Sequence, residues 1–303
     1  MNGRTIRIYL VDGSPTGMLA AEIINWTGKV LVSPRSHLAS LAKRDEAKRT
    51  GIYFLVGADP DNSTLERVYV GESDKVLSRL VQHDKDDSKD FWTRTIIVTS
   101  KDENLTKSHV RFLESRIIQM VSEAERAKLA NNTTPSTPVL PEADVADMEY
   151  FLGQIQMVLP VLGFSFLQPK PSFEIADKTV TEASPIFMIE SVGVKAKARE
   201  INGEFIVMKG STARKQGTPS WGDTYKTLRD DLVSKGKLVD AENPDYLVFA
   251  DDVPFNSPST AATVVRACSS NGRTEWKEIT TGKSYADWQE LQLKLAGIDD
   301  TES

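Results

Sequence analysis

The spacing of hydrophobic residues changes along the chain, and each change predicts a different element. Residues 4–11 alternate polar and apolar side chains, as a half-buried strand does, and a turn cluster rich in glycine follows them. Further short strands are expected before Ser33. From there the pattern becomes helical, with Ser33 as the N-cap and Pro34 in the first helical position. We expect this helix to end before Gly51.

The next stretch alternates short apolar strands with helices. Two strands joined by a polar connection predict a hairpin, and a helix, a third strand and a long helix follow it. The strands are expected at residues 51–56, 67–73 and 91–100, and the helices from about Asp74 and from Thr106 to about Leu129. Thr106 is a candidate cap. This order indicates an α+β fold.

A proline-rich connector follows, and a second small α+β domain is expected beyond it. Prolines 135, 138 and 141 lie too close together for a helix, although one is expected at about 143–158. The later strands are short and separated by turns. The expected regions are an N-terminal strand and helix extension (1–50), a central domain (51–132), the linker and its helix (133–183), a C-terminal domain (184–290) and a tail (291–303).

Composition narrows the function classes. No apolar run is long enough to cross a bilayer and no signal peptide is recognisable, so we expect a cytoplasmic protein with no membrane partner. One cysteine and three histidines exclude a cysteine-rich zinc site and leave oxygen ligands for any metal.

The net charge of −6 argues mildly against nucleic acid, but the charge is unevenly distributed. Residues 1–50 carry eight Lys and Arg against four Asp and Glu, whereas residues 131–183 carry two against seven. The acid is thus concentrated in the connector. Local binding of DNA through a few arginines and a cation stays open.

Glu114 is the strongest single indication of chemistry. It falls inside the apolar stripe of the helix expected at residues 106–129 rather than on its polar face. An unpaired buried charge costs several kcal/mol, so Glu114 needs an arginine, a hydrogen-bond network or a metal ion. A structural ion pair is the alternative.

Four other residues gain meaning only together. Arg79 and His83 lie one turn apart at the edge of the helix that starts near Asp74. Tyr53 and Tyr69 lie on neighbouring expected strands. Taken singly, the first two are typical of surface positions and the tyrosines of core positions.

The joint pattern resembles the GIY-YIG nuclease family. GIY stands at residues 51–53 and YVG at 69–71, Arg79 follows Gly71 by eight residues, His83 follows by four more, Glu114 lies on the later helix, and asparagines occupy 131 and 132. The resemblance covers about 80 residues. It departs from the family in a valine in the second tripeptide and in a long hairpin connection. Either asparagine could match the family's, and Asn131 is favoured.

The resemblance implies that the core is a small three-stranded antiparallel sheet flanked by helices. It also implies a metal-dependent endonuclease, a phosphodiester hydrolase acting on DNA in restriction, phage defence or DNA repair. Its catalytic residues would be Tyr53, Tyr69, Arg79, His83, Glu114 and Asn131. Glu114 would bind one Mg²⁺ or Mn²⁺ per active site. Tyr53 would be the base. Since a free phenol has a pKa of about 10, this role needs positive charge nearby, which Arg79 would supply.

The segment 255–277 resembles a small domain appended to restriction and DNA-modification proteins, the RAMA-like domain, whose function is unknown. The alternative is a purely structural role for its paired alanines, its Asn271-Gly272 turn and Trp276. Lys209, Arg214 and Lys215, together with Gly71, are the expected DNA-binding residues.

Other classes of function stay open at this stage. A non-catalytic nucleic-acid-binding module and an RNA-processing nuclease are the alternatives to a DNA endonuclease. The sequence also leaves open the recognition sequence, the dependence on modified bases, nicking against double-strand cleavage, and whether the protein is a homodimer.

Overall fold

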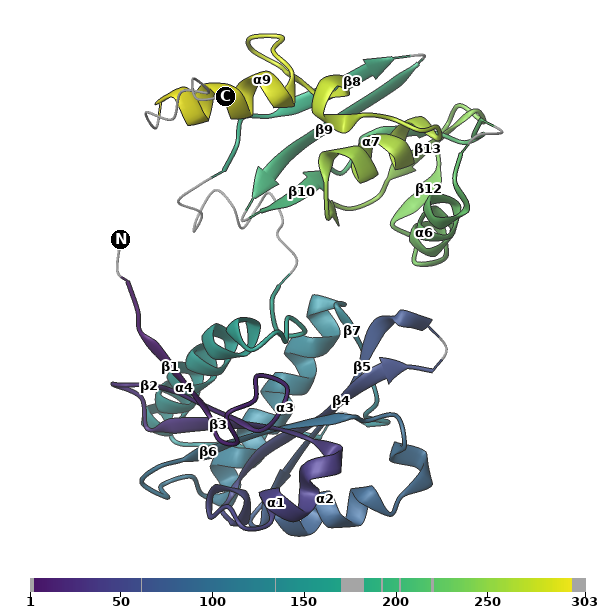
Figure 1. Cartoon of the computed structure of the whole chain (residues 1–303). Coiled ribbons are helices and arrows are strands. Elements are labelled where there is room, and N and C mark those ends of the chain that lie inside the picture. The colour runs from purple at the N-terminus through teal and green to yellow at the C-terminus, as the bar shows by residue number, and fades with distance from the viewer. Residues whose placement is uncertain are drawn as a thin grey trace. The chain divides into compact units, whose positions relative to one another are not determined.

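The computed structural model describes residues 3–60, 62–133, 135–169, 183–191, 193–201, 203–218 and 221–295. The chain divides into two compact units, Met1–Lys170 and Pro171–Ser303, and both combine strands with helices (Figure 1). The α+β class expected from the sequence is confirmed. Among the described residues, no helix is both long enough and apolar enough to span a lipid bilayer.

A seven-stranded sheet forms the centre of the first unit, in the order β1-β2-β3-β6-β4-β5-β7. Its strands are β1 (Ile6–Leu10), β2 (Leu19–Ile23), β3 (Gly28–Pro34), β4 (Gly51–Asp59), β5 (Asn62–Ser73), β6 (Arg94–Ser100) and β7 (Ala127–Leu129). Neighbouring strands are antiparallel except β5 and β7. The expected three-stranded sheet is β6, β4 and β5, in the middle of this larger one.

The first 50 residues belong to this sheet rather than to a separate extension. β3 pairs with β6 along its whole length, and β2 and β1 continue the sheet outward. The expected helix cap at Ser33 is wrong, because Ser33 is fully buried inside β3. Helical structure begins later, with a 3-10 turn η1 (Arg35–His37) and the short helix α1 (Leu38–Leu41).

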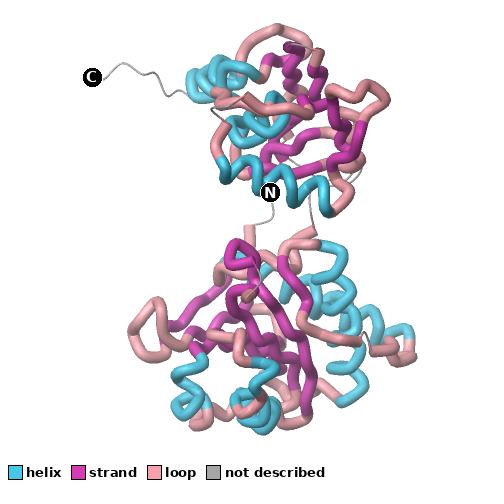
Figure 2. Tube along the Cα trace, turned by 90° about the vertical axis from the view of Figure 1, so that its right-hand side faces the viewer, coloured by secondary structure: helices cyan, strands magenta, loops and turns pink. Residues whose placement is uncertain are grey.

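Helices cover both faces of the sheet (Figure 2). α3 (Lys107–Ala124) and α4 (Glu142–Val161) pack on one face, and α1 and α2 (Val76–Asp84) pack on the other. Since side chains of a strand alternate between faces, Ile52 of β4 joins the core beneath α3 and α4, whereas Tyr53 joins the core beneath α1 and α2. The sheet thus sets which motif residues can meet.

Helix α3 begins where the sequence predicts and ends earlier. The side chain of Thr106 accepts a hydrogen bond from the main-chain N–H of His109, and His109 Nδ1 accepts one from Thr106, which closes a capping box. Glu125 adopts a left-handed conformation with φ of 48° and stops the helix at Ala124. The segment expected to complete the helix forms β7 instead.

The helix expected inside the linker is part of the first unit. α4 buries one side against the sheet and α3, contributing Phe151, Ile155 and Val158 to the same core as Ile52. The division between the units therefore falls at Lys170 rather than within the proline-rich stretch. Residues 170–182 of the expected linker lie outside the described residues.

The second unit is built from a five-stranded and a three-stranded sheet, in the orders β14-β10-β9-β8-β15 and β11-β13-β12. The strands are β8 (Phe187–Ser191), β9 (Val194–Ile201), β10 (Glu204–Val207), β11 (Thr212–Arg214), β12 (Leu238–Asp240), β13 (Tyr246–Phe249), β14 (Val253–Phe255) and β15 (Lys277–Glu278), and the helices are α6 (Asp223–Ser234), α7 (Pro258–Arg266), α8 (Gly272–Glu275) and α9 (Tyr285–Leu295). Part of the expected tail is helical, since α9 reaches Leu295; residues 296–303 lie outside the described residues.

Candidate active site

Two tyrosines and a histidine meet in the first unit, on the face covered by α2. Tyr53 Oη and His83 Nε2 share a buried hydrogen bond of 2.8 Å. The Tyr69 ring lies with its centroid 6.2 Å from that of Tyr53 and 5.2 Å from that of His83. The structure thus brings together three residues, the first and last of which are 30 positions apart in the sequence.

Strand pairing explains why the tyrosines meet. In the β4 and β5 pair, Tyr53 lies opposite Gly71 and Leu55 lies opposite Tyr69, so both phenols point to the same face. Gly71 is buried, and a Cβ built there would lie 2.4 Å from Tyr53 Oη. Gly71 was expected to contact DNA, but it is placed beneath Tyr53, where it leaves room for the phenol.

Arg79 lies at the rim of this cluster. It is exposed on α2, one turn before His83, and its Nη1 donates to Gln82 Oε1 at 2.8 Å. Its positive charge acts to lower the pKa of Tyr53, Tyr69 and His83. The guanidinium therefore supplies a field at the cluster while staying open to solvent.

Burial outweighs that field at the tyrosines. Loss of solvent raises the pKa of Tyr53 well above its ordinary value, and the neighbouring Tyr69 adds to the rise. Burial likewise raises the pKa of Tyr69, with the charge of Glu114 adding to it. Burial, together with Arg79 and Lys89, lowers the pKa of His83 to about 4. At neutral pH both phenols hold their protons and His83 is neutral.

Glu114 lies half-buried on α3 beside a second carboxylate. Burial and the negative charge of Glu72 raise the pKa of Glu114 to about 7, while Lys107 and Arg111 oppose the rise and the main-chain N–H of Glu72 hydrogen-bonds the carboxylate. Lys107 Nζ donates to Glu72 Oε2 at 2.7 Å. Glu72 and Glu114 are thus neighbouring carboxylates in a partly buried position, and Lys107 is paired with Glu72.

This arrangement suits a hard cation. Burial and the charge of Glu72 raise the pKa of Glu114 despite Lys107 and Arg111, so a cation bound there would stabilise the ionised carboxylate. Mg²⁺ is typically bound by one or two carboxylates, with waters completing its shell. Within the described ranges, no group of three or more His, Cys, Asp and Glu side chains could enclose a metal ion. The donor set therefore fits a cation that keeps several waters and does not fit a closed, all-protein cage.

Two site residues were missed in the sequence analysis. Glu72 follows YVG directly, and only its position at the end of β5 beneath α3 shows that it neighbours Glu114. Lys89, on the 3-10 turn η3 (Asp87–Lys89), places its Nζ 4.1 Å from the centroid of the Tyr69 ring. The first could have been suspected as a carboxylate inside the motif; nothing in the spacing pointed to the second.

Asn131 has a structural place beside the site. Its Oδ1 accepts from the Val70 main-chain N–H at 2.9 Å, and its Nδ2 donates to the Val70 carbonyl at 2.8 Å. The side chain thus continues the pairing of β5 beyond the end of β7, as a strand would. Asn132, the other asparagine considered, is exposed.

The expected DNA-binding residues of the second unit lie in different local structures. Lys209 is exposed after β10, Arg214 ends β11, and Lys215 Nζ is paired with Asp240. The three side chains therefore belong to different local structures.

The motif at 255–277 has clear packing roles. Ser257 caps α7, and Ala261 and Ala262 are fully buried on that helix. The Trp276 Nε1 donates to the Pro258 carbonyl at 3.0 Å, and a Cβ at Gly272 would lie 2.1 Å from the same carbonyl carbon. These residues hold α7 and α8 together.

Comparison with known proteins identifies part of the second unit. Residues 187–289 match the family model of a domain of unknown function, DUF4357. This agrees with the C-terminal domain of unknown function expected at 184–290 from the sequence. Searches against curated proteins and against solved structures gave no significant match.

Proposed function

We propose that the first unit is a nuclease of the GIY-YIG type that hydrolyses phosphodiester bonds in DNA, in restriction, phage defence or repair. The observation that carries the proposal is the buried Tyr53–His83 hydrogen bond of 2.8 Å, with Tyr69 against both rings. Arg79 and the Glu72–Glu114 pair flank it. Phenols, a neutral imidazole, an arginine and paired carboxylates suit attack by water on a phosphate.

Tyr53 and His83 would manage the proton of the attacking water. Because burial raises the pKa of Tyr53, a free phenolate is costly there. The pair avoids it if Tyr53 Oη takes the proton from water while passing its own to His83 Nε2. The phenol then relays a proton, and the imidazole holds it.

Arg79 and the acidic pair would act on charge. The exposed guanidinium of Arg79 can reach a phosphate and stabilise the negative charge that develops on the phosphate oxygens. Glu114, with Glu72 beside it, would hold a divalent cation through carboxylate oxygens. Bound there, Mg²⁺ or Mn²⁺ would polarise the scissile phosphate.

A cleavage assay with a matched pair of variants tests the proposal. Supercoiled plasmid, single-stranded DNA and RNA are incubated with the protein in Mg²⁺ or in EDTA. We expect plasmid cleavage that requires Mg²⁺, is lost in Glu114→Gln and is kept in Glu123→Gln, an exposed carboxylate on the same helix. Melting curves confirm that both variants fold. Cleavage of RNA alone, or a fully active Glu114→Gln protein, would contradict the assignment.

A further inference from the structure

A cationic cavity lies at the end of the first unit's sheet where β3 and β4 begin and β6 ends. Its volume is about 430 Å³. The lining residues are Lys29, Lys43, Arg44, Asp45, Glu46, Arg49 and Lys101. All seven are charged, with five cations against two carboxylates. The part of the chain with the largest basic excess in the sequence, residues 1–50, supplies six of these seven side chains.

Both carboxylates are already paired. Glu46 Oε1 accepts from Lys29 Nζ and from Arg44 Nη2, each at 2.7 Å. Burial opposes the ionisation of Glu46, but its hydrogen bonds to Lys29 and Arg44 lower its pKa to about 2. Asp45, on the approach to the 3-10 turn η2 (Glu46–Lys48), pairs with Lys48 at 3.2 Å. The acids therefore organise the cations and leave a net positive lining.

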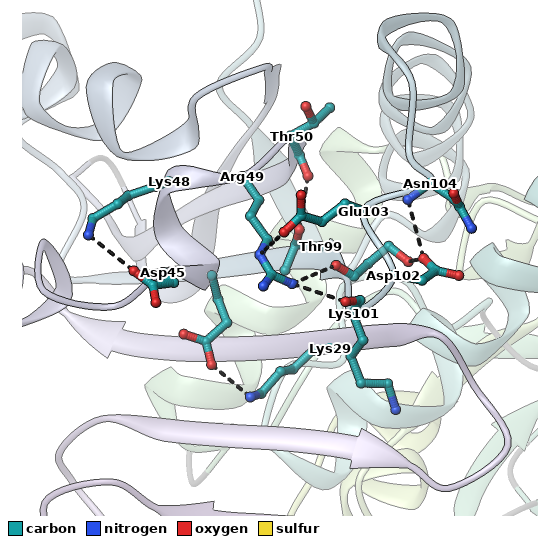
Figure 3. A network of polar contacts seen from close by, with 12 residues as sticks. Lys29, Asp45, Lys48, Arg49, Thr50, Thr99, Lys101, Asp102, Glu103 and Asn104 are labelled. Atoms are coloured by element: carbon teal, nitrogen blue, oxygen red, sulfur yellow. Dashed lines mark hydrogen bonds and ion pairs between the residues drawn. The ribbon is translucent and has the colours of Figure 1, made fainter.

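The remaining cations differ in how firmly they are held. Arg49 Nη1 donates to the carbonyls of Ser100 and Lys101 at 3.2 and 3.3 Å, and its Nε lies 3.2 Å from Glu103 Oε1 (Figure 3). Lys43 is exposed, and no salt bridge joins it to another described residue. Within the described part of the chain, the only ion pair of the Lys101 ammonium is a long one, 3.6 Å, with Glu22. The cavity thus combines a firmly held arginine with two lysines that an incoming anion could contact.

The cavity is built into the segment that leads to the candidate active site. The Arg49 carbonyl accepts from the N–H of Val76, the first residue of the helix that carries Arg79 and His83. Two residues after Arg49, β4 begins, and it carries Tyr53. At about 3.3 Å per residue, Arg49 lies roughly 13 Å along the chain from Tyr53, which is close to four base steps of a duplex.

We propose that this cavity binds backbone phosphates of the DNA substrate a few nucleotides from the bond that is cut. The inference rests on the proposed nuclease function. The lining of the cavity offers charge and hydrogen-bond donors but no aromatic or large apolar side chain on which a base could stack. It therefore suits contacts that position the duplex without reading its sequence.

Binding measured in EDTA tests the cavity independently of cleavage. Affinity for duplex DNA is measured from low to high NaCl for the wild type, Lys43→Ala, Lys101→Ala and the double variant. Arg7→Ala is the matched control, because Arg7 is an exposed cation on β1, at the far edge of the same sheet. We expect each cavity variant to make the plot of log affinity against log salt shallower by about one, and the double variant by about two, while Arg7→Ala matches the wild type.

The outcomes separate this inference from the proposed function. An unchanged salt slope in the double variant of a protein that still cleaves DNA overturns the cavity assignment alone. A shallower salt slope in the double variant, with a wild-type protein that never cleaves DNA, supports DNA binding by the cavity and contradicts the proposed nuclease function. Pyrophosphate titration distinguishes a free-anion site: if the double variant loses pyrophosphate binding but keeps its DNA slope, the cavity is not a DNA site.

Discussion

The balance between burial and charge at Tyr53 decides which proton the site can move. From the sequence, Arg79 was expected to lower the pKa of Tyr53 enough for the phenolate to act as a base. Arg79 is exposed, however, and solvent weakens its field. Tyr53 is almost fully buried, so desolvation dominates and raises its pKa. The phenol is better suited to donate to His83 and pass a proton on.

His83 should make the protein sensitive to moderate acid. Its pKa is about 4 in the folded protein and about 6.5 when unfolded, so between these values the unfolded state binds the extra proton. Its contribution to stability is thus present above about pH 6.5 and lost as the pH falls toward 4, by up to about 3 kcal/mol. Urea unfolding at several pH values should show this loss in the wild type and less of it in His83→Gln.

His37, which is partly exposed, is the control for that experiment, since His37→Gln removes a histidine outside the tyrosine cluster. The charged groups that act on the His83 pKa are Arg79, Lys89 and Asp86. The same acid dependence in wild type and His83→Gln would assign it to other residues.

Arg79 should matter for rate and not for folding. Because it is exposed, Arg79→Ala should change stability by less than about 0.5 kcal/mol. Loss of a charge-stabilising donor should lower the single-turnover cleavage rate by about 100-fold or more at saturating enzyme. Lys85→Ala removes an exposed cation from the end of the same helix and should leave the rate near that of the wild type. Equal rates for Arg79→Ala and Lys85→Ala would remove Arg79 from the catalytic set.

At the scale of elements, local patterns predicted more than pairing did. Thr106 and the start of α3 could be predicted because capping involves neighbours in sequence. Ser33 was misread because β3 is fixed by its pairing with β6, about 66 residues away along the chain, and a Ser-Pro pair favours a helix start only when no partner strand competes. The strands predicted before Ser33 and in the region 51–100 were found, and β1 and β2 pair with their neighbours in sequence. The attachment of β3 to β6 and of β7 to β5 depends on distant pairings.

The candidate site divides in the same way. The meeting of Tyr53, Tyr69 and His83 could be predicted, because strands and a helix were expected at their positions and the family resemblance groups these residues. The place of Glu72 beside Glu114 could not be predicted, because Glu114 lies on another element. A shift of one position along β5 would also move a side chain to the other face of the sheet. Positions set by long-range packing needed the structure.

Asn131 gives a prediction about an element rather than about catalysis. Its amide makes both hydrogen bonds to the buried Val70 main chain, at 2.9 and 2.8 Å. Asn131→Ala would leave a buried donor and acceptor unpaired and should cost about 2 kcal/mol of unfolding free energy. Asn132→Ala, at an exposed neighbour, should change it by less than about 0.5 kcal/mol. Urea melts of both decide; a stable but inactive Asn131→Ala protein would point to a catalytic role instead.

At the scale of the whole molecule, the boundary of the first unit follows from where apolar surface is buried. The proline-rich stretch suggested that the first unit ends near residue 132. Yet Ser115 Oγ on α3 donates to the Pro135 carbonyl at 3.2 Å, so the start of this stretch is held against the unit. α4 then completes the core on the α3 face. A proline run indicates a break in helix and says nothing about a domain boundary.

Truncation before and after α4 should therefore have opposite results. α4 buries Met148, Phe151, Leu152, Ile155, Val158 and Leu159. At about 1.5–3 kcal/mol for each of these six buried side chains, their loss amounts to about 9–18 kcal/mol, which matches or exceeds the whole stability of a typical domain. Fragment 1–170 should melt cooperatively, whereas fragment 1–131 should not. Differential scanning calorimetry of the two fragments, with fragment 183–303 as an independent comparison, measures this. A cooperative melt of fragment 1–131 at the midpoint of fragment 1–170 would show that α4 is dispensable to the core.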